Sequence, residues 1–412
     1  MIVNGIIHLA YLDPDLVMVR FTRKLQKEMI ETSFSISHSM TKLAKELGVN
    51  KTSLYDFLKA RFDGMSLRFV KKLSSFLVKN GFDEFSLTNL ECKVKSIKSN
   101  GVSKPIINPK LPFNFSTKPG ADVIASFLFD GGITSQLYPF YVNNSLNSLR
   151  KLVRNLKSVV GDVSYSIRRH SQHRETFIVE FPKIVGIILY ALGLVPGRKV
   201  RTDPEIPKFI FKADDTVKVS FIRRAFDDDG SVNTGTNNGS GKMVSLIQYS
   251  IKKSPPKRLI GLKGLIEQLG IRVNGPYGPV NKHVSKDGIT THGWMIQISN
   301  QSDIRKFAEK INFSIASKRK KLGELLSSYV LPPKLKKGET KRKVIEVCKK
   351  LSDNGKEITI RKVAKTLGKS ESWIAEIMRE LVKEGVIKVS HEKLSMRKFR
   401  GGFARKTFEF LQ

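Results

Sequence analysis

Helix-like and strand-like stretches alternate along the middle of the chain, from about residue 119 to residue 331. In the first half, a short helix (ADVIASFLFD) runs into DGGIT and is followed by a strand-like stretch, an amphipathic helix, two further strands and an apolar closing helix. In the second half, the helix DDTVKVSFIRRAFDD runs into DGSVN, and the same kinds of element follow in the same order. The pattern therefore predicts a duplicated unit of the α+β class.

The segments on either side of this repeat have a different character. Residues 22–100 are basic and helix-like, and residues 101–118 contain three prolines, which is typical of a linker. A second Pro- and Lys-rich linker follows the repeat, and a compact module ends the chain. We expect an N-terminal domain at 22–100, repeats at 119–200 and 205–331, a linker at 332–340 and a C-terminal domain at 341–412.

Charge narrows the choice of partner. The 412 residues include 73 Lys and Arg against 37 Asp and Glu, a formal net charge of +36. Such a chain repels itself unless a polyanion neutralises it, so a nucleic acid is the expected partner. A membrane is not expected, because no apolar run reaches about 18 residues and no long basic amphipathic helix is evident. We expect a soluble, cytoplasmic, nucleoid-associated protein. Cys92 and Cys348 lie far apart, without the spacing of a metal site.

Each half of the repeat contains an Asp-Gly pair at the end of its first helix, Asp130-Gly131 and Asp229-Gly230. A single Asp-Gly pair is an ordinary turn, but two at the same place in a repeat indicate a shared role. A calcium-binding loop over DDDGSVNTGTNNG is excluded, because Ala225 and Thr236 would occupy ligand positions.

The sequences SFIRRAFDDDGSV and IASFLFDGGI resemble the two signature helices of LAGLIDADG homing endonucleases that carry both repeats in one chain. The run SDIRKFAEKINFSIASKRKKLGELL resembles the end of the second repeat in archaeal and intein-type members. The resemblance covers about residues 119–331. It implies a duplicated αββαββα fold with two saddle-shaped antiparallel sheets around a pseudo-twofold axis. It also implies that Asp130 and Asp229 are catalytic and hold Mg²⁺ or another divalent cation, with Asp227 and Asp228 as the nearest spare carboxylates.

The sequence also departs from the family pattern. Small residues are expected five and one positions before each Asp; Ala125 fits, whereas Phe129, Arg224 and Asp228 do not. We therefore expect a loosened helix pair. An alternative alignment matches Phe129-Asp130 to Phe226-Asp227 and puts the metal position on Gly132. The Asp-Gly alignment is preferred because it keeps GGI beside GSV.

Basic residues on the predicted strands are candidates for contacts with the major groove of duplex DNA. They are Arg168, Arg169, Arg174, Lys252, Lys253, His283 and Lys286. Lys318 and Lys320 belong to a cluster that is either a phosphate-binding site or a solvated helix face.

Both terminal modules contain a helix-turn-helix candidate, with Ala44, Gly48 and Leu54 in the first and Ala364, Gly368 and Ile374 in the second. The second is followed by two strand-like stretches around a basic tip, which is the order of a winged helix. The predicted DNA contacts are Lys51, Thr52, Ser53, Tyr55, Lys369, Ser370, Ser372, Arg397, Lys398 and Arg400. A helical bundle used for protein contacts is the alternative.

These features favour a site-specific, metal-dependent DNA endonuclease. We expect a monomer, because the repeat supplies both half-sites. The alternative is a transcriptional regulator that uses a degenerate LAGLIDADG fold to bind DNA. Binding of structured RNA is a third possibility, although no RNA-binding module with stacking aromatic residues is evident.

Overall fold

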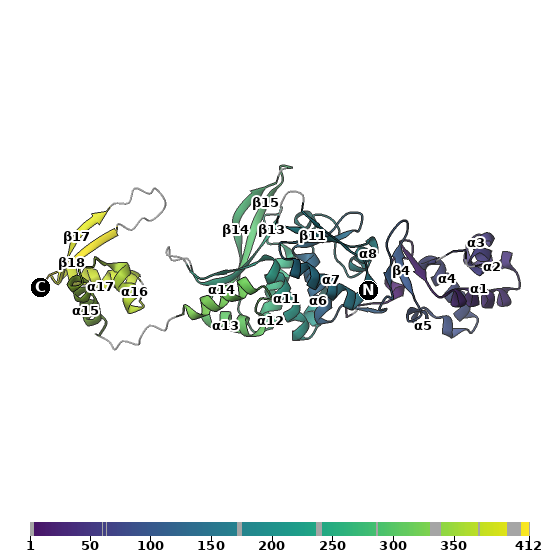
Figure 1. Cartoon of the computed structure of the whole chain (residues 1–412), viewed down its shortest axis with the longest axis horizontal. Helices are drawn as coiled ribbons and strands as arrows, with labels where there is room; N and C mark the ends of the chain where they lie inside the picture. The colour runs from purple at the N-terminus through teal and green to yellow at the C-terminus, as the bar shows by residue number, and fades with distance from the viewer. Residues whose placement is uncertain are drawn as a thin grey trace. The chain divides into compact units, whose positions relative to one another are not determined.

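The computed structural model describes residues 4–59, 61–62, 64–170, 175–235, 241–285, 287–329, 339–369, 371–393 and 405–411. The chain divides into two compact units, Met1–Leu326 and Ser327–Gln412. Both combine helices with antiparallel strands, which confirms the α+β class (Figure 1). Among the described residues, no helix has both the length and the apolar character needed to cross a bilayer.

The larger unit contains the duplicated order of elements predicted from the sequence. The first half comprises α6 (Lys118–Leu128), β7 (Gly131–Ile133), β8 (Pro139–Asn143), α7 (Leu146–Val160), β10 (Ser166–Arg169), β11 (Phe177–Glu180) and α8 (Lys183–Ala191). The second comprises α11 (Asp215–Asp229), β12 (Gly230–Asn233), β13 (Met243–Ser250), α12 (Lys257–Gln268), β14 (Asn274–Val284), β15 (Thr290–Ile298) and α13 (Gln301–Lys310). Helices α9 (Lys199–Thr202) and α10 (Lys208–Lys212) connect the halves, and α14 (Ala316–Ser327) follows the second.

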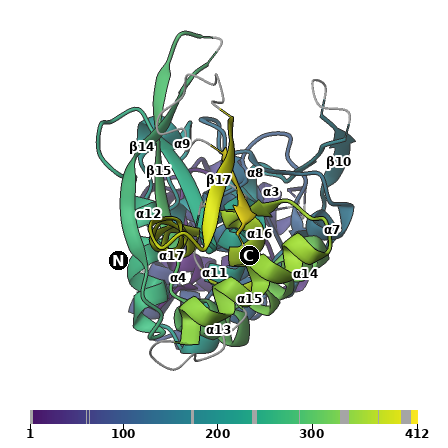
Figure 2. The same ribbon diagram turned by 90° about the vertical axis from the view of Figure 1, so that its left-hand side faces the viewer.

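The sheets of the two halves have the same topology. Their strand orders are β7-β8-β11-β10 and β12-β13-β15-β14, and all neighbouring strands are antiparallel. Each sheet therefore has the first strand of its half at one edge and the third strand at the other. Figure 2 shows these third strands, β10 and β14, on opposite sides of the unit. This connectivity is what an internal duplication predicts.

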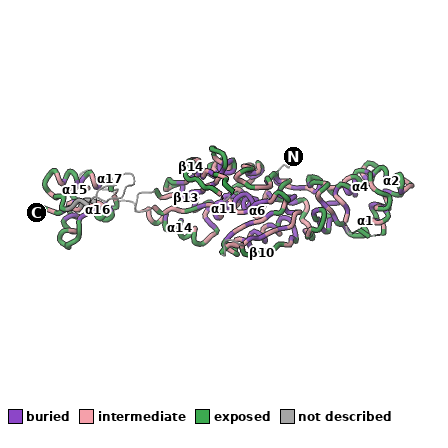
Figure 3. The backbone as a smooth tube through the Cα atoms, turned by 90° about the horizontal axis from the view of Figure 1, so that it is seen from above, coloured by how far each residue is buried: buried purple, intermediate pink, exposed green. Residues whose placement is uncertain are grey.

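Helices α6 and α11 pack along each other in the core of the unit, where Figure 3 shows them as buried. The rings of Phe129 and Phe221 meet edge to face across this pair, with centroids 6.1 Å apart. Arg224 is also buried there, with 1% of its surface exposed. The helices thus remain in contact although Phe129 and Arg224 replace small residues.

The N-terminal part of the chain forms helices α1 (Arg23–Ser37), α2 (Met40–Leu47), α3 (Lys51–Leu58), α4 (Leu67–Lys79) and α5 (Leu87–Glu91). Ser39 and Asn50 cap α2 and α3 by accepting hydrogen bonds from the backbone N–H groups of Lys42 and Thr52. Gly48 ends α2 with φ of 59°, a left-handed conformation that favours glycine. The predicted pair of helices with a turn at Gly48 is present.

Residues 101–118, expected to be a linker, contain two strands. A five-stranded sheet has the order β3-β2-β4-β5-β9, comprising β3 (Met65–Ser66), β2 (Val17–Arg20), β4 (Ser96–Ser99), β5 (Ile106–Ile107) and β9 (Asp162–Val163). A smaller sheet pairs β1 (Ile6–Ile7) with β6 (Phe113–Asn114). Ile106 and Phe113 are fully buried. The prolines stand between these short strands, and β5 connects the N-terminal sheet to β9 of the first repeat.

The smaller unit contains α15 (Glu339–Asp353), β16 (Ile358–Thr359), α16 (Ile360–Leu367), α17 (Glu371–Lys383), β17 (Ile387–Lys393) and β18 (Arg405–Phe410). Its sheet has the order β16-β18-β17. Val344, Ile374, Met378 and Leu381 are among the residues of its apolar core. Gly368 has φ of 61° between α16 and α17, so the turn repeats the one at Gly48.

Candidate active site

The two Asp-Gly pairs lie at equivalent places, where α6 and α11 give way to the first strand of each sheet. Gly131 pairs with Tyr141 on β8, and Gly230 pairs with Leu246 on β13. A Cβ at either glycine would lie 2.6 Å from a backbone oxygen, that of Phe140 or of Phe226. Both turns therefore require glycine because the backbones approach so closely.

An amide side chain contacts each acid from the same strand position. Asn143 lies two residues beyond Tyr141, and its Nδ2 donates to Asp130 Oδ2 at 3.1 Å. Gln248 lies two residues beyond Leu246, and its Nε2 donates to Asp229 Oδ2 at 2.7 Å. The strand register therefore supports the alignment that matches Asp130 with Asp229.

The two carboxylates are half-buried and influence each other electrostatically. Burial, followed by the negative charge of Asp229, raises the pKa of Asp130 to about 6. Burial also raises the pKa of Asp229, and the ammonium of Lys199 is the strongest influence in the opposite direction. Two partly desolvated carboxylates that repel each other form a region that a cation would stabilise.

At the C-terminal end of each signature helix, a lysine donates hydrogen bonds to the last backbone carbonyl groups. Lys199, on α9, donates from Nζ to the carbonyl oxygens of Leu128, at 3.2 Å, and Phe129. Lys318, on α14, donates to those of Asp227, at 2.6 Å, and Phe226, at 3.0 Å. Burial lowers the pKa of Lys199 to about 8, and burial also lowers that of Lys318. These cations satisfy the terminal carbonyl groups of both helices and increase the positive charge around the acids.

Asp228 and Arg224 form a buried ion pair, with Arg224 Nε 3.4 Å from Asp228 Oδ1. The Tyr141 hydroxyl donates to the same oxygen at 2.7 Å, and the guanidinium carbon of Arg224 lies 4.7 Å from the centroid of the Tyr141 ring. Asn143 Nδ2 also donates to the Tyr141 hydroxyl at 2.8 Å. The two residues that depart from the family pattern in the second helix therefore compensate each other, and Tyr141 and Asn143 connect them to Asp130.

Asp227, expected as a spare metal ligand, has a different environment. Its Oδ1 accepts hydrogen bonds from the backbone N–H groups of Ser314, at 2.8 Å, and Ile315, at 3.3 Å. These residues precede α14, so Asp227 anchors the start of that helix. Asp228 is instead the third acid close to Asp130 and Asp229. It accepts a hydrogen bond from the Tyr141 hydroxyl, and, after burial, the negative charges of Asp130 and Asp229 both raise its pKa. No group of three or more His, Cys, Asp or Glu side chains arranged to hold a metal occurs in the described part of the chain.

The candidate DNA-contacting residues of the repeat differ in their exposure and in their contacts with other side chains. Arg168 forms a two-point pair with Glu180 at 3.2 and 2.8 Å, and Arg169 lies 5.9 Å from the ring centroid of Phe177. Lys252, Lys253, His283 and Lys320 are exposed. Lys252 Nζ lies 3.5 Å from Asp203. Lys318 differs from the expectation of a phosphate contact on the surface, since its ammonium is used at the end of α11.

The candidate residues of the terminal modules lie at helix starts. Lys51, Thr52, Ser53 and Tyr55 occupy α3, with Lys51, Thr52 and Tyr55 exposed. In the smaller unit, Ser372 is exposed in the first turn of α17, and Lys369 Nζ lies 5.4 Å from the ring centroid of Trp373. Arg174, Lys286, Ser370, Arg397, Lys398 and Arg400 lie outside the described residues.

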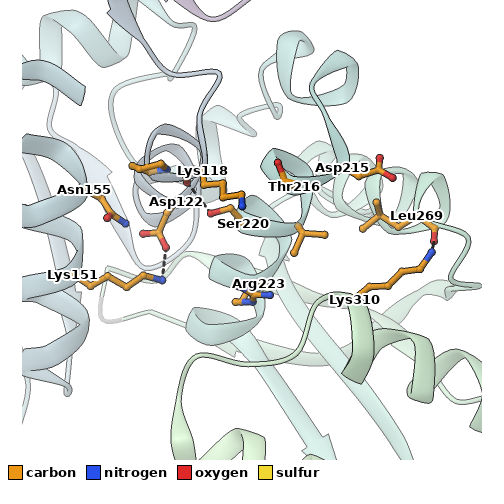
Figure 4. Close-up of a pocket in the computed structure, with 12 residues that line it drawn as sticks. Lys118, Asp122, Lys151, Asn155, Asp215, Thr216, Ser220, Arg223, Leu269 and Lys310 are labelled. Atoms are coloured by element: carbon orange, nitrogen blue, oxygen red, sulfur yellow. Dashed lines mark hydrogen bonds and ion pairs between the residues drawn. The ribbon is translucent and has the colours of Figure 1, made fainter. Parts of the chain in front are cut away.

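A cavity of about 580 Å³ lies at the other end of the helix pair (Figure 4). Its lining includes Lys118 and Asp122 of α6 and Asp215 of α11, near the N-termini of these helices. Asp122 forms an ion pair with Lys151 at 2.6 Å. Asp130 and Asp229 do not line this cavity, so it is separate from the acidic site at the C-terminal ends.

Known proteins similar to this chain cover only part of it or differ widely in sequence. No family model matches. The chain is 25% identical to the tRNA-splicing ligase RtcB of Pyrococcus furiosus over 218 residues, which cover 50% of this chain and 22% of that protein. It therefore spans about a fifth of the length of this curated relative.

Among solved structures, variants of the homing endonuclease I-DmoI are similar at 12% identity and a TM-score of 0.31, over 48% of this chain and 97% of theirs. I-DmoI in complex with DNA and Mn is similar at 14% and 0.30, with the same coverage. The N-terminal LAGLIDADG domain of WhiA is similar at 14% and 0.30, over 52% of this chain and 90% of that domain. These similarities are too low to place the chain in a family.

Sequence reasoning did not find several residues of the site. Asn143 and Gln248 follow their acids by 13 and 19 residues, so no common spacing marks them. Lys199 lies 70 residues from Phe129, in the connection between the halves. Arg258 is buried and contacts Gln248, although it looks like an ordinary helix-start cation. Only the strand register would have identified the two amides.

We predict that Asp130 makes the metal-free protein less stable as pH rises. Its pKa is about 6 when folded and about 3.8 when unfolded, so the folded state holds the extra proton between these values. The stabilisation is complete below about pH 4 and is lost as pH rises through 6. At pH 4, Asp130→Asn and wild type should have similar unfolding free energies. As pH rises to 7, wild type should lose about 2–3 kcal/mol relative to the variant. Denaturant unfolding in EDTA measures this, and a pH-independent difference would contradict it.

Proposed function

We propose that this protein is a site-specific endonuclease that hydrolyses duplex DNA with the help of a divalent cation. One observation carries the proposal: Asp130 and Asp229 end two packed helices, each directly before a glycine in the equivalent strand register. A duplicated acid site is suited to a substrate with two strands, because each half can act on one of them.

The residues present fit Mg²⁺ or a similar hard cation. Asp130 and Asp229 supply oxygen ligands, and their repulsion, which contributes to the raised pKa of Asp130, would be relieved by a cation. Mg²⁺ usually binds through one or two carboxylates together with phosphate oxygens and water, so a third acidic ligand is not required. When bound, the cation would act as a Lewis acid at the phosphate. Asn143 and Gln248 orient the carboxylates, and Lys199 and Lys318 add positive charge that favours the phosphate backbone.

The sheets supply a surface for the duplex. On β13, Val244 and Leu246 are buried, whereas Tyr249 points to the opposite face and its hydroxyl accepts a hydrogen bond from Asn281 Nδ2 at 3.1 Å. Uncharged hydrogen-bonding groups of this kind can read base edges in the major groove. Exposed basic residues at the strand edges and ends, including Arg169, Lys253 and His283, would then contact phosphates. We propose that the protein acts as a monomer, since one chain provides both halves.

Target selection from a randomised duplex library tests this function. Wild-type protein should release discrete double-strand breaks in Mg²⁺ and none in EDTA. A defined binding site without any cut, under all divalent cations tried, would contradict the endonuclease and favour a DNA-binding regulator.

The regulator is the second candidate, and the ammonium groups of Lys199 and Lys318 favour it. They donate to the carbonyl oxygens immediately before Asp130 and Asp229, those of Phe129 and Asp228, and their positive charge opposes a metal cation at the same oxygens. A chain that had lost cleavage could keep the same sheets and helices as a DNA clamp. The cleavage assay separates the two candidates, because only the endonuclease depends on the acids.

We propose that α2–α3 and the smaller unit are helix-turn-helix and winged-helix modules that extend the DNA footprint. Lys51, exposed at the start of α3, would contact a phosphate.

Lys51→Ala should weaken binding to the selected duplex about threefold to tenfold and reduce the slope of log K against log salt by about 1. Lys27→Ala, which removes an exposed lysine already paired with Glu31 at 3.4 Å, is the matched control. Equal effects of both variants would exclude a specific role for α3.

A further inference from the structure

The oxygen of each amide that contacts an acid is itself held by a donor at the start of the next helix. Asn143 Oδ1 accepts the backbone N–H of Ser145, the N-cap of α7, at 2.9 Å. Gln248 Oε1 accepts Nε of Arg258, the second residue of α12. An amide has one acceptor end and one donor end, so fixing the oxygen directs the NH₂ group toward the carboxylate.

The two holding arrangements differ in chemistry. In the first, besides Asp130, the direct partners of the amide are neutral: the Ser145 N–H and the Tyr141 hydroxyl, which accepts from Asn143 at 2.8 Å and itself donates to Asp228. The second contains a buried guanidinium, since Arg258 is 4% exposed and also donates to the carbonyl oxygen of Tyr249 at 3.3 Å. Hydrogen bonds from charged donors are roughly twice as strong as neutral ones. Asp229 is therefore held by a charge-assisted arrangement, and Asp130 is held by a neutral one.

We propose that Asn143 and Gln248 are positioning residues that each serve one strand of the duplex, with Arg258 as the anchor of the second. This inference rests on the proposed endonuclease function. Within the described residues, each amide donates to the acid of its own half, and no hydrogen bond joins Asn143 to Asp229 or Gln248 to Asp130. Loss of one amide should therefore misplace one acid and leave the other in position.

Strand-resolved cleavage tests the proposal. A supercoiled plasmid carrying the library-selected site is followed from the supercoiled through the nicked to the linear form, and end-labelled duplexes identify the cut strand. Asn143→Ala should slow one strand about tenfold to hundredfold and accumulate nicked plasmid. Gln248→Ala should slow the opposite strand, and Arg258→Met should slow the same strand as Gln248→Ala. Asn144→Ala and Gln268→Ala, which remove one exposed amide from each half, should behave as wild type.

The ratio of the two strand rates separates positioning from a general structural role. A variant that only loosens the fold slows both strands together, which would overturn the proposal, as would slowing of the same strand by Asn143→Ala and Gln248→Ala. If either alanine variant fails to fold, Asn143→Ser and Gln248→Ser, which keep a small polar side chain, give the same comparison. Absence of any cut by wild type would overturn the endonuclease function itself, and the inference with it.

Discussion

Asp130→Asn and Asp229→Asn should each abolish double-strand cleavage, lowering the rate of linear product roughly 10³-fold. Each substitution removes a negative charge from the site while keeping the size of the side chain, so Asn143 and Gln248 keep a neighbour of similar shape. A bound cation contributes several kcal/mol of transition-state stabilisation, and each 1.36 kcal/mol corresponds to a tenfold change in rate. Losing the carboxylate of one half should remove most of that contribution on one strand, which is enough to prevent the double-strand break.

Three measurements make this expectation specific. Duplex binding in Ca²⁺ or EDTA should be close to that of wild type, because the acids repel rather than attract phosphate. Calorimetric titration with Mg²⁺ should show weaker binding in both variants. Asp162→Asn, an exposed acid on β9, is the matched control and should cleave normally. Full cleavage by Asp130→Asn would contradict this expectation. It would show that Asp130 is not required and that Asp229 alone supplies the catalytic carboxylate.

Arg224→Met should destabilise the larger unit by about 3–5 kcal/mol, the usual effect of removing one partner of a buried ion pair. The variant leaves Asp228 without its cation in a setting where burial already raises the pKa of that carboxyl. The double variant Arg224→Met, Asp228→Asn should recover most of the loss, because replacing a whole buried pair with groups of similar volume is often close to neutral. The destabilisation by Arg224→Met should also shrink as pH falls, since protonation removes the unpaired charge.

Denaturant unfolding in a Trp373→Phe background measures this effect. Trp294 on β15 is then the only tryptophan and reports on the larger unit. Lys263→Met, which breaks an exposed pair with Glu267 on α12, is the control and should change the unfolding free energy by less than about 0.5 kcal/mol. If Arg224→Met were as stable as wild type, or the double variant as unstable as the single, the pair would not be what compensates for the missing small residues.

These two experiments address different properties of one helix end. Asp229 accepts a hydrogen bond from Gln248, lies within the influence of the Lys199 ammonium, and is proposed to act on the substrate. Its neighbour Asp228 instead neutralises Arg224 within the helix interface. Asp227 anchors α14. Three consecutive aspartates thus have three different roles, although their side chains are identical. The roles follow from the 100° rotation between successive helix residues, which points each side chain at a different neighbour.

Local sequence determined the order and type of the elements. The periodicity of apolar residues marked six of the seven elements of each half, and Asp-Gly marked the end of each signature helix, where the remaining short strand begins. Ser39, Asn50 and Thr359 cap helices, and Gly48 and Gly368 adopt left-handed turns, because these are properties of single residues and their immediate neighbours. Such features depend on interactions within a few positions, which a sequence displays directly.

Only the tertiary structure decided which side chains surround the acids. Lys199 reaches carbonyl groups 70 and 71 residues away, Lys318 reaches one 92 residues away, and Tyr141 meets Asp228 across 87 residues. The prolines of residues 101–118 indicated a linker, yet the apolar residues between them pair with strands far along the chain. Burial and pairing of this kind depend on which distant surfaces the fold brings together. Short-range patterns do not contain that information, so it appears only when the chain is folded.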